Sequence, residues 1–333
     1  MGSDCGSSVK PAAFAPTPRG LPYSAGMDTP YTAVRTPAHH ELNIRGLRYH
    51  TLHWGDASLA TALRPPLVMA HGWMDVAASF QFVVDALAAL EGPIRHVIAL
   101  DWRGFGLTQT PAADCYWFPD YLGDLDAVLD AVSPGAPVDL VGHSMGGNVV
   151  MTYAGVRPQR VRKLINLEGF GMPRTQPHMA PKRYADWLDQ LREPAHLSTY
   201  DSLDAVAERL RKTNPLLSAR RAAWLAPHWS RIAADGRWEI LGDPAHKRIN
   251  PVLHQVEETL ECWKRIAAPL LWVEGERTDI GKWWSGRYSR DEFEARLAHV
   301  GNVEKHKLAD AGHMLHHDQP EELARRLAHF LGA

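Results

Sequence analysis

The sequence predicts an α/β protein with a mostly parallel, eight-stranded sheet, helices on both faces of the sheet and a helical cap inserted into the chain. Short apolar runs alternate with helical patterns, which is typical of strands that are buried on both faces and joined by helices. This alternation stops between residues 170 and 268 and then resumes. A chain of 333 residues is long enough to bury one full core and to carry such an insertion.

The composition gives no sign of a polyanionic partner. Lys and Arg number 36 and Asp and Glu number 38, so neither nucleic acid nor an anionic membrane is expected to bind. Cys5, Cys115 and Cys262 are few and far apart, which argues against a disulfide framework. No apolar run reaches the roughly 18 residues of a membrane helix, and no secretory signal is visible. These features predict a cytoplasmic protein without a membrane span.

The chain divides into three parts by composition and pattern. Residues 1–38 are rich in Pro, Gly, Ser and Ala, which predicts an extended or disordered leader. The sheet and its helices are expected over residues 39–169 and 269–333. Residues 170–268 are expected to form the cap, because a loop of that length is uncommon unless it has structure of its own.

The first half contains a hairpin and four apolar runs. The hairpin is expected over residues 41–50, where the residues alternate and then turn at Gly46. The remaining predicted strands and helices are, in order, 66–70, helix 80–90, 96–100, helix 120–132, 138–141, a helix that ends at Val156, and 164–167.

The cap region shows helical patterns at 184–191, 203–211, 219–225 and 252–266. It carries Trp187, Trp224, Trp229, Trp238 and Trp263, which are expected to form the core of the cap or, for one or two of them, to line an apolar pocket. After it, the pattern predicts a strand at 270–273, a helix at 291–300, a strand at 303–308 and a helix at 320–330.

A sharp turn with a serine at its apex follows the strand 138–141. Gly142 and Gly146 lie two residues before and two residues after Ser144, and an apolar helical pattern follows. Only glycines let a strand and a helix pass so closely, and the turn projects the serine hydroxyl above the edge of the sheet. We therefore expect Ser144 to be a nucleophile.

Residues that follow other strands complete a candidate site, because ligands bind at the carboxyl ends of parallel strands. Free backbone amides at Trp73 and Met145 are expected to form an oxyanion hole. His313, directly after Gly312 on the loop behind the last strand, is the expected general base. Two strand ends offer a carboxylate for this histidine, and we favour Glu168 over Asp279.

Several other polar residues near strand ends are expected to have no catalytic role. Asp101 and Arg103 are expected to stabilise a turn. His316, His317 and Asp318 resemble a metal cluster, but no second ligand group with regular spacing accompanies them. We expect a solvated helix start there, and neither a metal nor an organic cofactor.

The motifs together resemble the α/β-hydrolase fold superfamily. They are His71-Gly72, Asp101-x-Arg103-Gly104-x-Gly106, Gly142-x-Ser144-x-Gly146 and Gly312-His313, with serine, acid and histidine in that order. In much of the superfamily the acid is an Asp three residues after a Gly behind the seventh strand, but here that position is Thr278. The segment Leu167–Pro173 resembles the branch in which a Glu after the sixth strand is the acid, as in serine-hydrolase-like proteins and some haloalkane dehalogenases.

The resemblance implies a capped serine hydrolase, similar to carboxylesterases, that acts on an ester-type bond of a small to medium, apolar substrate. Haloalkane dehalogenases and epoxide hydrolases of this fold carry Asp at the elbow, so Ser144 makes their reactions unexpected. A carbon–carbon bond hydrolase, a lactonase or a cofactor-free perhydrolase would need the same triad. A ligand receptor on a hydrolase scaffold is the alternative from another class.

Overall fold

The computed structural model describes residues 31–91 and 94–332, so most of the predicted leader lies outside the described residues. Its main sheet has eight strands in the order β1-β2-β4-β3-β5-β6-β10-β11. These strands are β1 (Ala38–Ile44), β2 (Leu47–Trp54), β3 (Leu67–Ala70), β4 (Val97–Leu100), β5 (Val138–His143), β6 (Val161–Leu167), β10 (Leu270–Gly275) and β11 (Val303–Leu308). Within this sheet, as far as the structure describes it, β1–β2 and β2–β4 are the antiparallel pairs and the other neighbours are parallel. The predicted fold class is confirmed.

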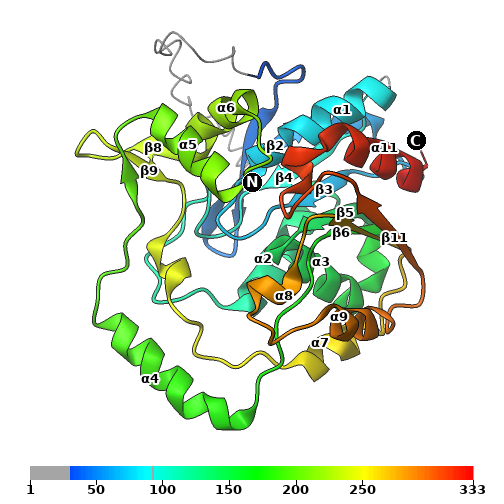
Figure 1. The fold of residues 1–333 in the computed structure, drawn as a ribbon. Coiled ribbons are helices and arrows are strands. Elements are labelled where there is room, and N and C mark those ends of the chain that lie inside the picture. Colours follow the sequence, from blue (N-terminus) through cyan, green and yellow to red (C-terminus); the bar gives the residue numbers. More distant parts are fainter. Residues whose placement is uncertain (1–30, 92–93, 333) are drawn as a thin grey trace, which may run out of the picture.

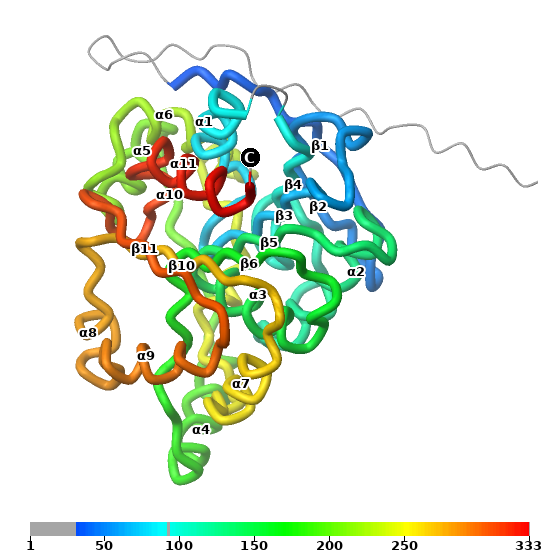
Figure 2. Tube along the Cα trace, turned by 90° about the vertical axis from the view of Figure 1, so that its right-hand side faces the viewer, coloured from blue at the N-terminus to red at the C-terminus, as the bar shows by residue number. Residues whose placement is uncertain are grey.

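Helices cover both faces of the sheet (Figures 1 and 2). One layer consists of α1 (Gln81–Glu91) and α11 (Pro320–Leu331), and the other consists of α2 (Phe118–Val132), α3 (Met145–Val156), α7 (Val256–Trp263) and α9 (Arg290–Leu297). Successive residues of a strand point to opposite faces. Val68 of β3 therefore packs into the core under α2 and α3, whereas Met69 packs into the core under α1 and α11.

The strands β6 and β10 are neighbours in the sheet, although residues 168–269 separate them in the chain. The intervening residues 170–268, here called the inserted segment, contain α4 (Ala180–Leu191), α5 (Leu203–Thr213), α6 (Ala219–Trp229) and α7. They also contain a small antiparallel sheet that the sequence pattern did not predict, formed by β7 (Thr199–Tyr200), β8 (Ser230–Ile232) and β9 (Trp238–Ile240). Helix α4 buries no side chain and projects from the body (Figure 1).

The tryptophans of the inserted segment do not form one common core. Trp263 is buried in the main core under the sheet, together with residues of α3. Trp224 and Trp229 are partly buried against a third apolar cluster, in which α5 and α6 pack around Phe82 of α1. The expectation of a cap core built by all the tryptophans is therefore wrong for Trp263, because α7 packs against α3 rather than against the other helices of the segment.

Backbone hydrogen bonds join the inserted segment to the loop after β4. Gly106 N donates to Leu241 O at 3.0 Å, and Asp243 N donates to Gly104 O at 2.8 Å. The Tyr116 hydroxyl donates to Asp243 at 2.8 Å. The segment is thus held close to the carboxyl ends of the strands. None of the helices in the described residues combines the length and the hydropathy that a membrane crossing requires.

Candidate active site

Ser144 lies between β5 and α3 in a strained backbone conformation. Its φ is 51° and its ψ is −113°, which side chains other than glycine rarely adopt. The turn is tight because the start of α3 packs closely against the end of β3. A Cβ at Gly146 would lie 2.3 Å from the carbonyl oxygen of Ala70, the last residue of β3. Only a hydrogen atom fits there, so the glycine at this position lets the serine reach the edge of the sheet.

His313 lies on the loop between β11 and α10 (Leu315–Asp318) and contacts both other members of the predicted triad. Its Nε2 is 2.9 Å from Ser144 Oγ, and its Nδ1 is 2.7 Å from Glu168 Oε2. In the neutral tautomer that suits this geometry, Nδ1–H donates to the carboxylate and Nε2 accepts from the hydroxyl. The arrangement can remove a proton from the serine and stabilise the resulting imidazolium.

Glu168 directly follows β6 and has a φ of 58°. Its side chain is fully buried, and Oε1 accepts a hydrogen bond from Gly275 N of the neighbouring strand β10 at 2.6 Å. Its own amide donates to Val273 O at 3.1 Å. The carboxylate is therefore fixed by the backbone of β10, with Oε2 left to accept from His313.

Asp279, the alternative acid, has a different role in the structure. It caps the short helix α8 (Ile280–Trp283), where its side chain accepts from Lys282 N at 3.2 Å. Its side chain is 52% exposed and forms an ion pair with Lys282 at 3.6 Å. Of the two candidate carboxylates, Glu168 is thus the one that hydrogen-bonds His313.

The two predicted oxyanion donors border Ser144. Met145 is the first residue of α3, where backbone amides have no acceptor within the helix. The loop before Trp73 lies against the serine, because a Cβ at Gly72 would be 3.1 Å from Ser144 Cβ. His71 holds this loop through contacts from both ring nitrogens, with Nδ1 2.7 Å from Gly72 O and Nε2 accepting from Trp102 N. Burial lowers the pKa of His71, and a neutral ring suits these two bonds.

Asp101 and Arg103 stabilise the loop after β4, as expected. Asp101 accepts hydrogen bonds from Ala77 N at 2.7 Å and Leu107 N at 2.9 Å. Arg103 forms a bidentate pair with the buried side chain of Asp124.

Residues around the His313 loop hold its backbone in place, a role that the sequence pattern did not predict for them. Asp318 accepts from Gly312 N at 2.9 Å and from the Asn214 side chain at 2.8 Å. His143 donates from Nε2 to the His313 carbonyl at 2.8 Å, and burial holds the pKa of His143 well below its usual range. The position of His143 directly before Ser144 could have indicated a role at the site. Its partner could not be predicted, because His313 is distant in the chain.

The expectation of a solvated helix start at residues 316–318 is wrong. His316 and His317 are 0% and 2% exposed, because α10 lies under α1 and places both rings against Phe80 and Phe82. A local pattern could not reveal this, since the residues that cover the rings come from the other end of the chain. Asp75 joins the same buried cluster.

Comparisons with known proteins agree with this architecture. The profile of a family described as "alpha/beta hydrolase fold" matches residues 65–320. A serine hydrolase-like protein of Danio rerio is 25% identical over 219 residues, which are 62% of this chain and 63% of that protein. A cis-3-alkyl-4-alkyloxetan-2-one decarboxylase of Shewanella oneidensis is 22% identical over 307 residues, 88% of this chain and 87% of that protein.

Solved structures show the same fold. The thioesterase domain from the curacin biosynthetic pathway superposes with a TM-score of 0.75 at 23% identity, over 88% of this chain and 99% of that domain.

Proposed function

The chain belongs to the alpha/beta hydrolase fold family, and from that premise we propose that it is a serine hydrolase that cleaves ester-type bonds of a small to medium, apolar substrate. The observation that carries the proposal is the continuous series of hydrogen bonds from Ser144 through His313 to Glu168. A serine hydroxyl is a weak nucleophile unless a base takes its proton, and an imidazole 2.9 Å away can do so.

The reaction proceeds through an acyl-enzyme. Ser144 Oγ attacks the substrate carbonyl while its proton moves to His313 Nε2, and Glu168 stabilises the imidazolium through Nδ1–H. The amides of Trp73 and Met145 donate to the oxyanion of the tetrahedral intermediate. His313 then protonates the leaving group and activates the water that releases the acid.

Exposed aromatic side chains beside the triad support an apolar substrate. Trp283 is 42% exposed, and its ring centroid is 4.3 Å from that of His313. Trp73 is 52% exposed on the loop that borders Ser144. Aromatic side chains left open to solvent next to a nucleophile offer apolar contact area to a bound acyl or alcohol group.

We propose that the inserted segment acts as a cap over this site. The side chain of Asn214 in the segment donates to Asp318 of α10 at 2.8 Å, and Asp318 in turn accepts from Gly312 N of the His313 loop. At the other side, a Cβ at Gly242 would lie 3.4 Å from the sulfur of Met74, directly after Trp73. The segment thus contacts both loops that carry the proposed catalytic groups, as a cap that selects substrates would.

A strained cyclic ester is a second candidate substrate. The Shewanella oneidensis relative is named as a decarboxylase of an alkylated oxetan-2-one, which is a four-membered lactone, and it aligns along 88% of this chain. A lactone carbonyl presents the same electrophile to Ser144, so the proposed triad serves both substrate classes.

Hydrolysis of p-nitrophenyl esters and alkyl lactones of graded chain length tests the proposal. We expect turnover by the wild type and a loss of about 10⁶ in rate for Ser144→Ala. Ser58→Ala is the matched control. It changes an exposed serine that is distant in sequence from all three members of the proposed triad, and it should retain full activity. Equal rates in the wild type and Ser144→Ala would refute the proposal.

Labelling with a fluorophosphonate probe separates an enzyme from a receptor that only retains the scaffold. An activated Ser144 reacts and is labelled in the wild type and Ser58→Ala but not in Ser144→Ala. A wild type that remains unlabelled would favour the receptor.

A further inference from the structure

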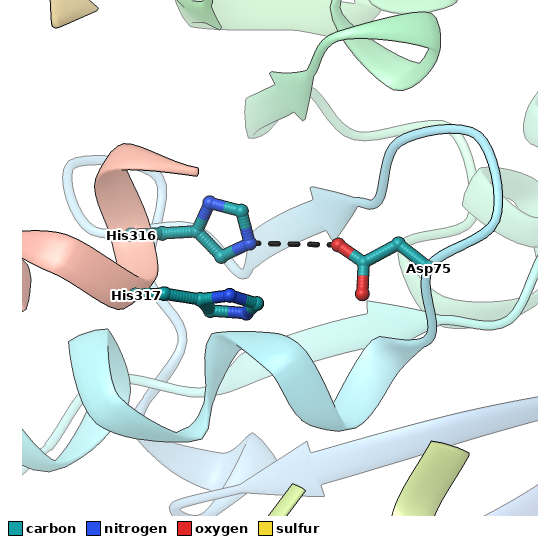
Figure 3. Close-up of side chains that lie close together, drawn as sticks. All are labelled: Asp75, His316 and His317. Atoms are coloured by element: carbon teal, nitrogen blue, oxygen red, sulfur yellow. Dashed lines mark ion pairs between the residues drawn. The ribbon is translucent and has the colours of Figure 1, made fainter. Parts of the chain in front are cut away.

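A second cluster of ionisable side chains lies behind His313, outside the proposed triad. It consists of Asp75, on the loop between β3 and α1, and of His316 and His317 on α10. The three residues are at most 2% exposed. Figure 3 shows the two imidazoles side by side, with the carboxylate directed at His316.

Four polar atoms of this cluster lack hydrogen-bond partners among the described residues. Asp75 Oδ2, both ring nitrogens of His316 and Nε2 of His317 are buried without one. The other oxygen of Asp75 is occupied, because it accepts from Val76 N at 2.8 Å and from the Ser79 hydroxyl. Buried polar atoms are rarely left unpaired. Because one ligand atom from each of the three residues lies within 4.8 Å of the others, a single bound group could serve as their missing partner.

The separations within the cluster suit a metal ion better than a direct ion pair. His316 Nε2 lies 3.5 Å from Asp75 Oδ2, whereas charge-assisted N–H···O bonds are about 2.7–2.9 Å long. Two ligands of a tetrahedral cation, each at about 2.0–2.1 Å from it, lie roughly 3.4 Å apart. One ligand atom from each of the three residues lies within 4.8 Å of the others, so roughly an ångström of ring movement closes the set.

We propose that Asp75, His316 and His317 bind one divalent transition-metal cation of the zinc class. Two imidazole nitrogens and one carboxylate oxygen are a donor set that suits this class, with a water molecule in the fourth position. Hard cations such as Mg²⁺ and Ca²⁺ prefer oxygen ligands and fit this set poorly.

The position of the cluster gives the ion a structural consequence. Asp75 follows Trp73 by two residues, and His316 follows His313 by three. A bound cation would therefore join the loop of the proposed oxyanion hole to the loop of the proposed base. It takes no part in the chemistry at Ser144, and the site exists whether or not the proposed hydrolase activity is found.

Metal binding tests the proposal directly. Tag-free protein is stripped with a chelator and titrated with Zn²⁺, and bound zinc is measured by calorimetry and elemental analysis. Co²⁺ serves as a spectroscopic probe, because tetrahedral coordination gives a visible absorption band. We expect one equivalent of zinc, a visible Co²⁺ band, and an unfolding temperature that rises with zinc concentration.

Two variants test proposed ligands, and a third is the control. His317→Phe replaces one ring by an apolar ring of similar shape beside Phe82, and Asp75→Asn removes the carboxylate charge. Each should lower zinc affinity at least 100-fold, with the fold checked by circular dichroism. His40→Gln is the matched control. The exposed His40 lies against His53 in a separate histidine group on β1 and β2, so its loss should leave the high-affinity zinc site intact.

Two outcomes would overturn the proposal. One is that the wild type binds zinc no more tightly than His317→Phe does. The other is that Asp75→Asn destabilises the protein equally with and without chelator, which would show that Asp75 and His316 form only a buried ion pair.

Discussion

At the scale of single residues, Ser144 and Glu168 share an unusual property. Both have a positive φ, 51° and 58°, although neither is glycine. Such conformations cost about 1–3 kcal/mol each and persist where the surroundings enforce them. The two lie at the ends of adjacent strands, and Ser144 N donates to the carbonyl of Leu167, the residue before Glu168, at 2.8 Å. This linked pair of strained residues directs both side chains toward His313.

The proposed role of Glu168 is tested by comparing it with the other candidate acid. Glu168→Gln keeps the shape but removes the negative charge that stabilises the imidazolium, so kcat on a p-nitrophenyl ester should fall by about 10²–10⁴. Asp279→Asn changes only a helix cap and an ion pair with Lys282 at the surface, and should keep wild-type kcat. Loss of activity in Asp279→Asn with an unaffected Glu168→Gln would reverse the assignment.

Sequence reasoning at this scale reached the residues whose local pattern is distinctive. Ser144 stands out because glycines flank it, and His313 because it follows a glycine behind the last strand. The choice between Glu168 and Asp279 stayed open because it depends on how β6 lies beside β10, which no local pattern contains. The burial of His316 and His317 was missed for the same reason, since Asp75 and Phe80 come from the opposite end of the chain.

At the scale of elements, the contact between α3 and α7 depends on one glycine. A Cβ at Gly155 would lie 1.9 Å from Cys262 O, a backbone atom that cannot move aside cheaply. Gly155→Ala should therefore lower the free energy of unfolding by about 1–3 kcal/mol or more. Urea unfolding measures this loss as a lower midpoint.

The control for this prediction is Gly301→Ala, because a Cβ at Gly301 would meet no atom within 4 Å. That variant should have the midpoint of the wild type. Equal midpoints for Gly155→Ala and Gly301→Ala would mean that α3 and α7 separate easily and that the close approach has no energetic weight.

His246 of the inserted segment stacks between Phe105 and Tyr116, with ring centroids 3.8 Å and 3.7 Å apart. Burial lowers the pKa of His246 to about 3, from 6.5 for an ordinary histidine. Below pH 6.5 the unfolded chain therefore binds a proton that the folded chain does not. The free energy of unfolding should fall by up to about 1.4 kcal/mol per pH unit between pH 6.5 and pH 3 through this residue alone.

The variant His246→Phe isolates this contribution, because a phenyl ring keeps the stack and cannot bind a proton. Between pH 7 and pH 5 the wild type should lose about 2 kcal/mol more stability than the variant. Chemical denaturation at the two pH values measures the difference. Parallel losses in both proteins would show that His246 is protonated in the folded state.

At the scale of the whole molecule, the alternation of strands and helices was sufficient to predict the layers of the main sheet. The apolar runs are continuous rather than alternating, as expected for strands that are buried on both faces, so each run identified a strand. The small sheet β7-β9-β8 was not predicted, because strands of two or three residues show no alternation. The packing of Trp263 against the main core was not predicted. The periodicity of a helix shows which of its faces is buried but does not show which other element covers that face.

The third apolar cluster joins the inserted segment to the body of the protein. Leu210 of α5 and Leu225 of α6 share this cluster with Phe82, which belongs to α1 over the main sheet. The buried cluster of α5 and α6 is therefore completed by a side chain of α1. We expect both parts to unfold in one cooperative transition.

Leu210→Ala tests this coupling. Leu210 is 4% exposed, and its truncation should cost about 2–5 kcal/mol and lower the unfolding temperature by several degrees. Far-ultraviolet circular dichroism reports mainly on the whole fold, and Trp224 and Trp229 contribute to the tryptophan fluorescence. Because the segment and α1 share one apolar cluster, the transitions measured by the two methods should shift together. Leu188→Ala, at a 51% exposed position on α4, is the control and should leave the transition unchanged. Leu210→Ala could instead shift the fluorescence change to a lower temperature and leave the dichroism change unaltered. The inserted segment would then be an independent folding unit, and Phe82 would contribute only a weak contact between the segment and the body of the protein.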